Sequence, residues 1–354
     1  MPSYGETLYT VTPVPAAPVY SIGASINGSG QVTGTVGIGQ SDFAFLYSNG
    51  ALTLLSQPGI ASQGYGINDL SEVVGFSGPH AVLYNNAGAV DLGTLPGDRR
   101  DLLEIAEDSN SIALAINDSS QITGEAQSSG SGVHAFLYSN GVMTDLGTLP
   151  GGSNSMGYGI NASGQITGQS GIAGGASHAF LYSNGAMTDL DTLPGGSNSV
   201  GYGINNSGQI TGQSGVAGGS SHAFVYASGI MTDLGTLPGG SISVGYGINN
   251  SGEIVGESIG PGGASHAFIS SNGVLTDLNS LVDPALGITL GDAVGVNDSG
   301  QIIANGTGAG VFGRRAYLLT PVSAEVPEPW TFAAAGAGLC ILAAIRLPAR
   351  TARA

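Results

Sequence analysis

A repeated phrase constrains this chain more than any other feature of its sequence. The phrase GINNSGQITG recurs in recognisable variants along almost the whole chain. Its first asparagine lies at positions 27, 68, 117, 161, 205, 249 and 297, so successive copies are separated by 41, 49, 44, 44, 44 and 48 residues. Self-similarity at such a period is typical of repeat architectures. The chain is therefore expected to contain seven units of about one length.

Each unit has the pattern of four short strands. GYGI and QITGQS flank a polar turn, NNSG or NASG, and HAFLYS and AMTDL flank an Asn-Gly pair, which is a strong hairpin signal. Four antiparallel strands in a repeat of this length match a propeller blade, whereas a helical solenoid would need 3.6-residue periodicity. We predict an all-β fold, a seven-bladed β-propeller of four-stranded antiparallel blades, as a single domain over residues 8–320.

The two ends of the repeat region predict how the ring closes. Unit seven reads AVGVNDSGQIIA and then RRAYLLT, and it stops at Pro321 without a fourth strand. A surplus strand, LYTVTPV at residues 8–14, precedes the first unit. We predict that Leu8–Val14 pairs with Arg315–Thr320, with Pro13 in the place that an aspartate takes in other units. Closure of this kind removes an open sheet edge.

Composition excludes several classes of function. Hydrophobic residues make up 41% of the chain, which is too many for a disordered protein. Four arginines face 23 acidic residues within residues 1–325, so nucleic acid is a poor partner. The absence of lysine excludes a Walker-type phosphate loop and a Schiff-base nucleophile. Cys340 is the only cysteine, so no disulfide framework and no cysteine-based zinc site is expected, and no cofactor is predicted.

A histidine followed eleven residues later by an aspartate recurs in five units. The pairs are His80 and Asp91, His134 and Asp145, His178 and Asp189, His222 and Asp233, and His266 and Asp277. Unit one has Phe43 and Leu54 at these positions, so both polar partners are missing together. Folding each HAFLYSNGAMTDL segment about its Asn-Gly turn brings the two side chains close together. We therefore predict that each pair is in contact.

Two functional readings of these pairs compete with a structural one. A His-Asp pair could belong to a catalytic triad, with Ser177 or Ser183 as the nucleophile, and histidines are zinc ligands. Catalysis needs one constellation in one pocket, however, and the pair recurs five times around the ring. A carboxylate that orients a histidine within its blade satisfies buried polar groups. We interpret the pairs as structural, and we predict no catalytic or metal-binding residue.

Two further features of the repeat bear on function. Asn-X-Ser triplets match the glycosylation pattern, but turn chemistry accounts for them at a hairpin; they begin at Asn27, Asn117, Asn161, Asn205, Asn249 and Asn297. Residues 98–108 and 281–292 lengthen two units and depart from the repeat. Such departures are candidate functional loops, although a solvated loop is the simpler reading.

The repeat as a whole resembles a known family. HAFLYSNG, MTDLGTLPGG and YGINNSGQITG are similar to the bacterial HAF-type extracellular repeat, over roughly residues 8–320. The resemblance implies an exported protein, and it does not imply an enzyme.

The C-terminal segment, residues 326–354, has three parts. Val326, Pro327, Glu328 and Pro329 precede an apolar run over residues 330–345, and Arg346, Arg350 and Arg353 follow it. This order resembles the PEP-CTERM sorting signal, which implies processing by an exosortase-type membrane peptidase. The apolar run predicts a helix of about 24 Å, a short transmembrane segment against a hydrocarbon core of about 30 Å. The positive-inside tendency then places the propeller outside the inner membrane, with the tail as a transient anchor.

Export also requires an N-terminal signal peptide. MPSYGETLYTVTPV has neither a basic region nor an apolar region of that kind, so we expect the natural start to lie further upstream.

The leading hypothesis is an exported, non-enzymatic module of the cell envelope or extracellular matrix, which acts in adhesion or biofilm-matrix organisation. Its expected partner is an exopolysaccharide or another envelope protein. The alternative is a carbohydrate-active enzyme or lectin that uses one rim of the propeller, for which a deep axial pocket with two unpaired carboxylates would be the sign.

Overall fold

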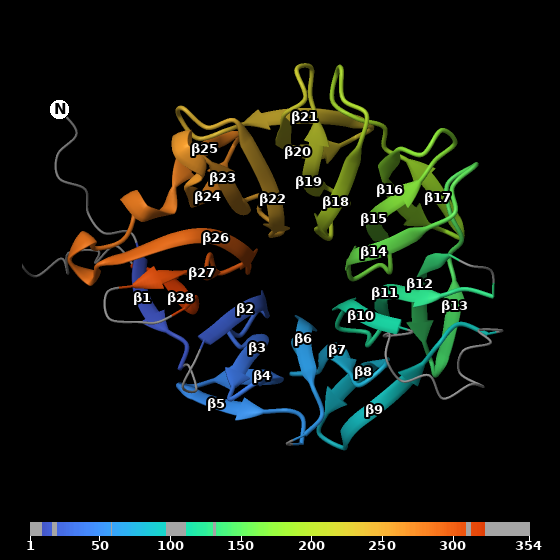
Figure 1. The fold of residues 1–354 in the computed structure, drawn as a ribbon, viewed down its shortest axis with the longest axis horizontal. Coiled ribbons are helices and arrows are strands. Elements are labelled where there is room, and N and C mark those ends of the chain that lie inside the picture. Colours follow the sequence, from blue (N-terminus) through green and yellow to red (C-terminus); the bar gives the residue numbers. More distant parts are fainter. Residues whose placement is uncertain are drawn as a thin grey trace, which may run out of the picture. The chain divides into compact units, whose positions relative to one another are not determined.

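The computed structural model describes residues 9–15, 20–57, 59–96, 111–129, 132–308 and 313–322. The chain divides into two units, Met1–Pro321 and Val322–Ala354. The described residues of the first unit form seven four-stranded antiparallel sheets around one axis (Figure 1). The prediction of a seven-bladed β-propeller is therefore confirmed. The predicted C-terminal helix, the sorting motif and the basic end of the tail all lie outside the described residues.

Each blade begins with the strand nearest the axis and ends with the strand at the periphery (Figure 1). Blades 1 and 2 consist of β2 (Tyr20–Ile26), β3 (Val32–Ile38), β4 (Ser41–Ser48), β5 (Ala51–Leu54), and of β6 (Ser62–Ile67), β7 (Val73–Ser77), β8 (His80–Asn85), β9 (Gly88–Gly93). Blades 3 and 4 consist of β10 (Ser111–Ile116), β11 (Ile122–Gln127), β12 (Val133–Ser139), β13 (Val142–Asp145), and of β14 (Ser155–Ile160), β15 (Ile166–Gly171), β16 (Ser177–Ser183), β17 (Ala186–Asp189). Blades 5 and 6 consist of β18 (Ser199–Ile204), β19 (Ile210–Gly215), β20 (Ser221–Ala227), β21 (Ile230–Gly235), and of β22 (Ile242–Ile248), β23 (Ile254–Ile259), β24 (Ser265–Ser271), β25 (Val274–Asp277). Blade 7 consists of β26 (Ile288–Val296), β27 (Ile302–Gly308), β28 (Arg315–Pro321) and β1 (Tyr9–Pro13).

Blade 7 joins the two ends of the repeat region. β1 pairs with β28 in antiparallel register, with Tyr9 opposite Pro321 and Pro13 opposite Tyr317. In blade 4 the residue opposite Phe180, which corresponds to Tyr317, is Asp189. The predicted closure is thus confirmed, and Pro13 does take the place of the aspartate.

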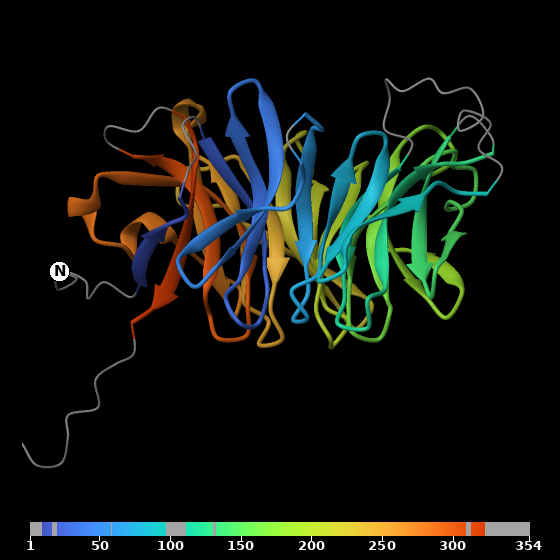
Figure 2. The ribbon, with the colours of Figure 1, turned by 90° about the horizontal axis from the view of Figure 1, so that it is seen from below.

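The outer hairpins follow the turn chemistry of the sequence. In blade 4 the hairpin of β16 and β17 turns at Asn184 and Gly185, both with positive φ, at 53° and 82°. Two positive φ values in a two-residue turn match the right-handed twist of the strands, and asparagine and glycine adopt them at least cost. Figure 2 shows turns at both faces of the ring, with the strands running between them.

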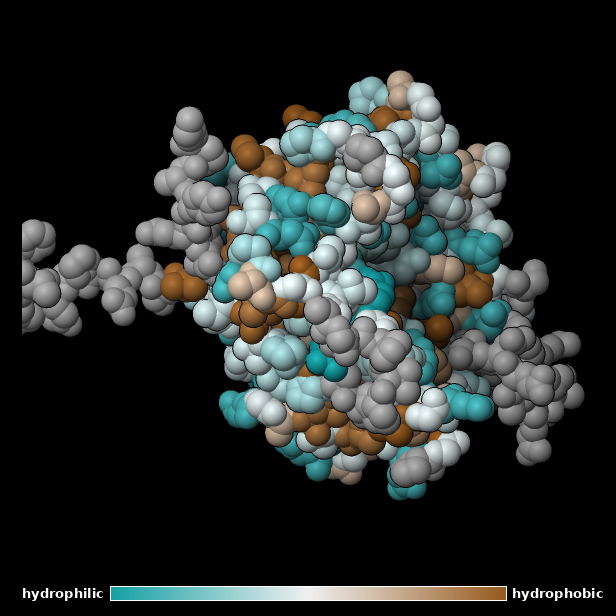
Figure 3. All heavy atoms as spheres, turned by 60° about the vertical axis from the view of Figure 1, so that its left-hand side comes forward, coloured by the Kyte–Doolittle hydropathy of each residue, from teal (hydrophilic) through white to brown (hydrophobic). Residues whose placement is uncertain are grey.

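The hydrophobic core lies between neighbouring blades. A fully buried phenylalanine occupies the third strand of five blades, at Phe45, Phe136, Phe180, Phe224 and Phe268. Phe180 packs with Ile166 of its own blade and with Ala135 and Leu149, which precede blade 4 in the chain. Burial of one such side chain stabilises the fold by about 1.5–3 kcal/mol. Val142 and Val274, at the outer hairpins, are exposed apolar side chains, and Figure 3 shows apolar surface in several separate groups among polar surface.

The described residues contain three short 3-10 helices and no α-helix. They are η1 (Pro261–Gly263), η2 (Leu278–Ser280) and η3 (Pro284–Leu286). The departure at 281–292 consists of η3 and the start of β26, and the backbone N–H of Tyr9 donates to the Leu281 carbonyl, 3.2 Å away. This segment therefore supports the closing strand. In the described part of the chain no helix is long and apolar enough to cross a membrane. Residues 98–108 lie outside the described ranges.

Candidate functional site

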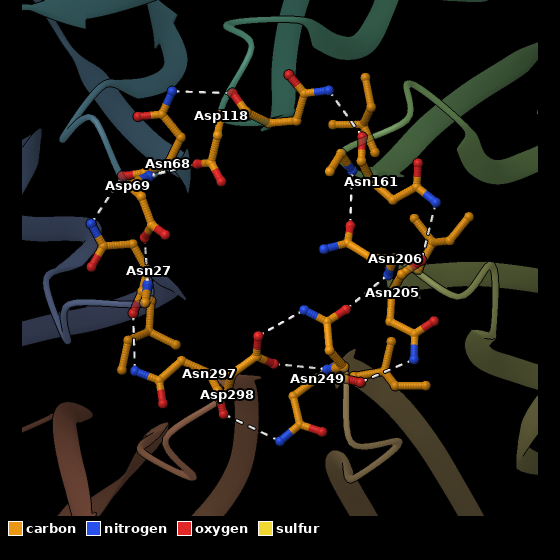
Figure 4. Close-up of a pocket in the computed structure, with 18 of the residues that line it drawn as sticks. Asn27, Asn68, Asp69, Asp118, Asn161, Asn205, Asn206, Asn249, Asn297 and Asp298 are labelled. Atoms are coloured by element: carbon orange, nitrogen blue, oxygen red, sulfur yellow. Dashed lines mark hydrogen bonds between the residues drawn. The ribbon is translucent and has the colours of Figure 1, made fainter.

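The turn between the first two strands places one asparagine of each blade at one end of the central channel. These residues form the asparagine ring: Asn27, Asn68, Asn117, Asn161, Asn205, Asn249 and Asn297. In each, Nδ2 donates to the backbone carbonyl of the equivalent asparagine in the next blade, at 2.9–3.2 Å. The bond from Asn297 to Asn27 completes the circle. Figure 4 shows these amides around the channel.

Both polar atoms of each asparagine amide form hydrogen bonds. In blade 5, Asn205 Oδ1 accepts from the backbone N–H of Gln209 at 3.0 Å, and Asn205 Nδ2 also donates to Gln209 Oε1 at 2.8 Å. The same two bonds occur in each blade, and the ring asparagines are only 3–6% exposed. Turn chemistry alone is thus an incomplete account of these residues, because they also join blade to blade. Their buried amides are not available as glycosylation acceptors.

Acidic and amide side chains follow the asparagine ring at its mouth. Asp69, Asp118, Asn206, Asn250 and Asp298 each accept a backbone N–H from the preceding blade, at 2.7–3.0 Å. The cavity that they line measures about 310 Å³. No group of three or more acidic, histidine or cysteine side chains suited to a metal ion occurs among the described residues. These carboxylates act as acceptors for the neighbouring turns.

At the other end of the channel, each innermost strand contains a β-bulge. In blade 4, Gly157 pairs with Gly168 and Gly159 pairs with Thr167, so Tyr158 is the extra residue. The two strands approach so closely there that a Cβ on Gly168 would clash with the Met156 carbonyl oxygen. Bulges re-aim a side chain and are common beside functional sites. The bulged residues, here called the bulge ring, line the channel: Ala24, Tyr65, Leu114, Tyr158, Tyr202, Tyr246 and Val294.

Four members of the bulge ring are tyrosines, and three of them are consecutive. The Tyr158 and Tyr202 ring centroids lie 5.2 Å apart, and those of Tyr202 and Tyr246 lie 5.5 Å apart, with tilted planes. They line a cavity of about 580 Å³, here called the tyrosine cavity. Burial raises the pKa of Tyr65, Tyr158, Tyr202 and Tyr246 above the ordinary value, so the phenols stay neutral near pH 7. Aromatic faces and hydroxyl groups therefore share one wall of the cavity.

In blades 4, 5 and 6 the second strand places a polar residue, Gln169, Gln213 or Glu257, at the position beside the bulged tyrosine, whereas blade 2 has Phe76 there. In blade 6, Tyr246 Oη donates to Glu257 Oε1 at 2.8 Å, and Ser265 Oγ donates to Glu257 Oε2 at 2.7 Å. In blade 4, Gln169 Nε2 lies 3.4 Å from Tyr158 Oη. The equivalent residue in blade 3 is Glu125, whose Oε2 is buried and has no hydrogen-bond partner among the described residues.

Blade 7 contributes a carboxylate to the lining of this cavity. Asp292 lines the tyrosine cavity and forms an ion pair with Arg314, while Asn305 Nδ2 donates to its Oδ2 at 3.1 Å. Asn305 also bonds both the N–H and the carbonyl of Gly23, so it fastens blade 7 to blade 1. Glu257 has two hydrogen-bond donors, Asp292 Oδ1 has its ion pair with Arg314 and no hydrogen bond, and Glu125 Oε2 has neither kind of partner among the described residues.

The structure brings each predicted His-Asp pair into contact. Nδ1 of His80, His134, His178, His222 and His266 lies 2.7–2.9 Å from a carboxylate oxygen of Asp91, Asp145, Asp189, Asp233 and Asp277, respectively. Each pair joins the third and fourth strands of one blade, at its periphery (Figure 1). In blade 4, Asp189 Oδ1 also accepts the N–H of Asp191, which has a positive φ of 62°. The pair therefore fixes the exit of the outermost strand.

One premise of the sequence interpretation is wrong. The aspartates are not buried, since their side chains are 30–65% exposed, whereas four of the five histidines are 13–24% exposed. A carboxylate in water keeps its hydration when the histidine is removed. Each pair is a partly exposed contact between the third and fourth strands of one blade, and it is not part of a buried polar network.

Comparisons with known proteins support the fold of this chain and do not identify its family or its activity. No family model matches the chain, and no curated sequence is significantly similar to it. Among solved structures, a puromycin-hydrolyzing peptidase from Mycobacterium tuberculosis is similar at 11% identity and a TM-score of 0.55, over 90% of this chain and 56% of that chain. YCF48 bound to D1 peptide is similar at 11% identity and a TM-score of 0.53, over 91% of this chain and 99% of that one.

These likenesses agree with the propeller architecture. The chain spans little more than half the length of the peptidase, so the peptidase has parts without a counterpart in the matched region. At 11% identity the likeness concerns the fold alone.

Sequence reasoning missed both rings. The GYG triplet, repeated in blades 2, 4, 5 and 6, was available as a signal, because glycines on both sides of an aromatic residue indicate a bulge in a strand. The asparagine ring carried no comparable signal, since Asn in a turn has a sufficient local explanation.

Proposed function

We propose that this chain is a binding module rather than an enzyme, and that it takes an oligosaccharide segment into the tyrosine cavity. The supporting observation is the bulge ring, which aims Tyr158, Tyr202 and Tyr246 from three successive blades into one cavity. Sugars present C–H faces that pack on aromatic rings and hydroxyl groups that bond to phenols, amides and carboxylates. All three kinds of group surround this cavity.

The charge of the chain narrows the ligand class. The formal net charge is −17, and Arg314, which contacts the cavity residue Asp292, is paired with it. Phosphate-rich and uronic polymers would be repelled by this potential. A neutral or cationic saccharide of an exopolysaccharide fits it.

The pairing of the carboxylates favours binding over glycoside hydrolysis. Hydrolysis by the usual mechanism needs two carboxyl groups that both reach the scissile bond. Glu257 and Asp292 have partners within the protein, and Glu125, whose buried Oε2 has none among the described residues, lies on the second strand of blade 3 outside the residues that line the cavity. A carbohydrate-active enzyme is therefore the weaker of these two readings.

A peptide ligand is the second candidate. YCF48, whose full length resembles this propeller in fold, is described in complex with D1 peptide. Because the likeness is one of fold, it supports the capacity of such a ring to bind peptides and identifies no sequence.

The wider role follows from the sequence. We propose export and display at the cell envelope or in the extracellular matrix, with residues 326–354 as the sorting signal read by an exosortase-type peptidase. Fractionation of cells that produce the full chain, compared with cells that produce residues 1–325, tests this part. Equal distributions of the two forms would contradict it.

The binding proposal is tested with the full chain on a panel of neutral, amino and acidic oligosaccharides. Tyr202→Leu is the informative variant, because blade 3 already carries Leu114 at this position and the fold accepts it. We expect at least one neutral or amino oligosaccharide to bind, and Tyr202→Leu to weaken it by about tenfold, which corresponds to one aromatic contact. Ala24→Ser, on the opposite side of the bulge ring, serves as the control. Binding that is unaffected by Tyr202→Leu would place the ligand elsewhere.

A further inference from the structure

Blade 3 interrupts the pattern of the channel wall. Its bulged residue is Leu114, whereas blades 2 and 4 on either side have Tyr65 and Tyr158. Its second strand carries Glu125, whereas blades 4 and 5 have Gln169 and Gln213 at that position. The leucine is shorter than a tyrosine and has no hydroxyl group, so the interruption opens the wall in front of the second strand, where Glu125 lies outside the residues that line the cavity.

Blade 6 shows what a glutamate at this position needs. Glu257 receives one hydrogen bond from Tyr246 Oη and another from Ser265 Oγ. The residues at these two positions in blade 3 are Leu114 and Val133, and neither can donate from its side chain. Glu125 has thus kept the carboxylate and lost both of its donors. Its Oε2 is buried without a partner in the described chain, and burial raises the pKa of this carboxyl group.

An unpaired buried carboxylate oxygen costs free energy in the empty protein. Such a cost is recovered when a ligand supplies the missing donor, and an ionised carboxylate bonds most strongly to a cationic donor. The charge of Glu125 raises the pKa of both Tyr65 and Tyr158, after the larger effect of burial, so these phenols lie within its field. Aromatic rings on two sides of a carboxylate suit an ammonium group, which interacts with both.

We propose that the gap at blade 3 is a subsite for a protonated amino group, and that the preferred ligand is an oligosaccharide containing free amino sugars. Glu125 accepts hydrogen bonds from the ammonium group, Leu114 provides the room, and Tyr65 and Tyr158 flank it. This inference rests on the proposed binding of saccharides in the tyrosine cavity and adds to it a chemical preference.

The experiment measures binding of three trisaccharides to the full chain by calorimetry: the glucosamine trimer, the N-acetylglucosamine trimer and cellotriose. Acetylation removes the charge and keeps the sugar rings, so the first two form a matched pair. We expect the glucosamine trimer to bind at least about tenfold more tightly than its acetylated form. Trilysine supplies the same ammonium groups without sugar rings, and we expect it to bind more weakly than the glucosamine trimer.

Three variants locate the preference. Glu125→Gln places in blade 3 the residue that blades 4 and 5 carry, and Leu114→Tyr restores the hydroxyl donor that blade 6 has. Each variant should abolish the preference, so that the amino trimer binds about as tightly as the acetylated trimer. The affinity for the acetylated trimer itself should stay unchanged. Glu257→Gln is the control, because this carboxylate already has its partners, and it should keep the preference.

The outcomes separate the inference from the function on which it rests. Equal affinity of the native chain for the amino and acetylated trimers, or a preference that survives Glu125→Gln, overturns the subsite. Tighter binding of trilysine than of every saccharide overturns the sugar ligand and favours a basic peptide. If cellotriose binds and Tyr202→Leu weakens it, the saccharide function stands even when the amino preference fails.

Discussion

The two ends of the channel are built from the same seven innermost strands and the turns that follow them, yet they tolerate variation very differently. At one end all seven blades have asparagine, and every amide bonds to the next blade. At the other end the bulged residue ranges from alanine to tyrosine. Each asparagine amide forms the hydrogen bond that joins its blade to the next one, whereas the bulged side chain lines an open cavity. Within one chain, therefore, constancy marks the scaffold and variation marks the surface that is free to specialise.

Blades 3 and 6 show the same contrast at one position, that of Glu125 and Glu257. Both have a glutamate on the second strand, but the fold satisfies Glu257 and leaves Glu125 Oε2 without a partner in the described residues. A group that serves only the scaffold would be paired by the scaffold. Four predictions test this contrast between scaffold and specialised surface.

The largest effect is expected from removing the closing strand. Deletion of residues 1–14 takes β1 from blade 7 and exposes the edge of β28, which also strains the bond from Asn297 to Asn27. We expect the loss of several kcal/mol, and a chain of this size loses roughly 2 °C in melting temperature for each kcal/mol. Differential scanning calorimetry measures it. Deletion of residues 1–8 alone is the control, and equal melting of the two forms would contradict closure by β1.

A smaller loss is expected from opening one bond of the asparagine ring. Asn205→Ala removes the donors to Asn249 and Gln209 and leaves the part-buried N–H of Gln209 without its acceptor, which should cost about 2–4 kcal/mol. Asn206→Ala is the matched control, because blade 4 has Ala162 there. Urea unfolding should place Asn206→Ala within about 1 kcal/mol of the native chain. Similar costs for both variants would mean that the ring has no special role.

The peripheral pairs should matter less. From sequence alone, His178→Ala is expected to cost about 1–3 kcal/mol if Asp189 is buried. Because the Asp189 side chain is 42% exposed, the structure lowers the expected cost to less than about 1 kcal/mol. Asp189→Ala should cost more, since it also removes the acceptor for the N–H of Asp191. A double-mutant cycle checks the contact, and fully additive costs would show that the two side chains do not interact.

The smallest expected effect has the opposite sign. Burial raises the pKa of Glu125, so its charged form is disfavoured in the folded state relative to the unfolded chain. Below the unfolded pKa the carboxyl group is neutral in both states, and the cost of its charge develops as pH rises through the raised folded pKa. Glu125→Gln should therefore be more stable than the native chain at pH 7 and equal to it at low pH. Thermal melts at a series of pH values measure the difference, and destabilisation at pH 7 would show that the fold itself uses this carboxylate.

Much of the fold was predictable because its information is local. The Asn-Gly pairs of the outer hairpins have one favourable backbone geometry, and the spacing of the repeat fixes four strands per blade. The closing strand was also predictable, because a repeat that lacks one strand at its end and has a surplus one at its start can be completed in one simple way. The contact of each histidine with its aspartate was also predicted, although His178 was expected beside Asp189 or one residue away, and in the structure Asp189 lies opposite Phe180, two residues along the strand.

The candidate site was not predictable to the same degree. The sequence identifies Tyr158 as one aromatic residue among many, and only the pairing of Gly157 with Gly168 and of Gly159 with Thr167 makes it the bulged residue that faces the channel. The exposure of Asp189 likewise depends on its place at the rim, which no local pattern encodes.

The sequence by itself determined the strands, their turns, the number of blades and the closing pair, because these depend on contacts between residues close in the chain or on the repeat count. The tertiary structure alone decided which asparagine amide meets which carbonyl and which carboxylate lacks a partner. Those contacts join residues about 44 positions apart, such as Asn161 and Asn205, and they exist only when the ring has closed. Glu125 and Glu257 look alike in sequence, and the residues packed around each carboxylate make one a part of the scaffold and leave the other open to a ligand.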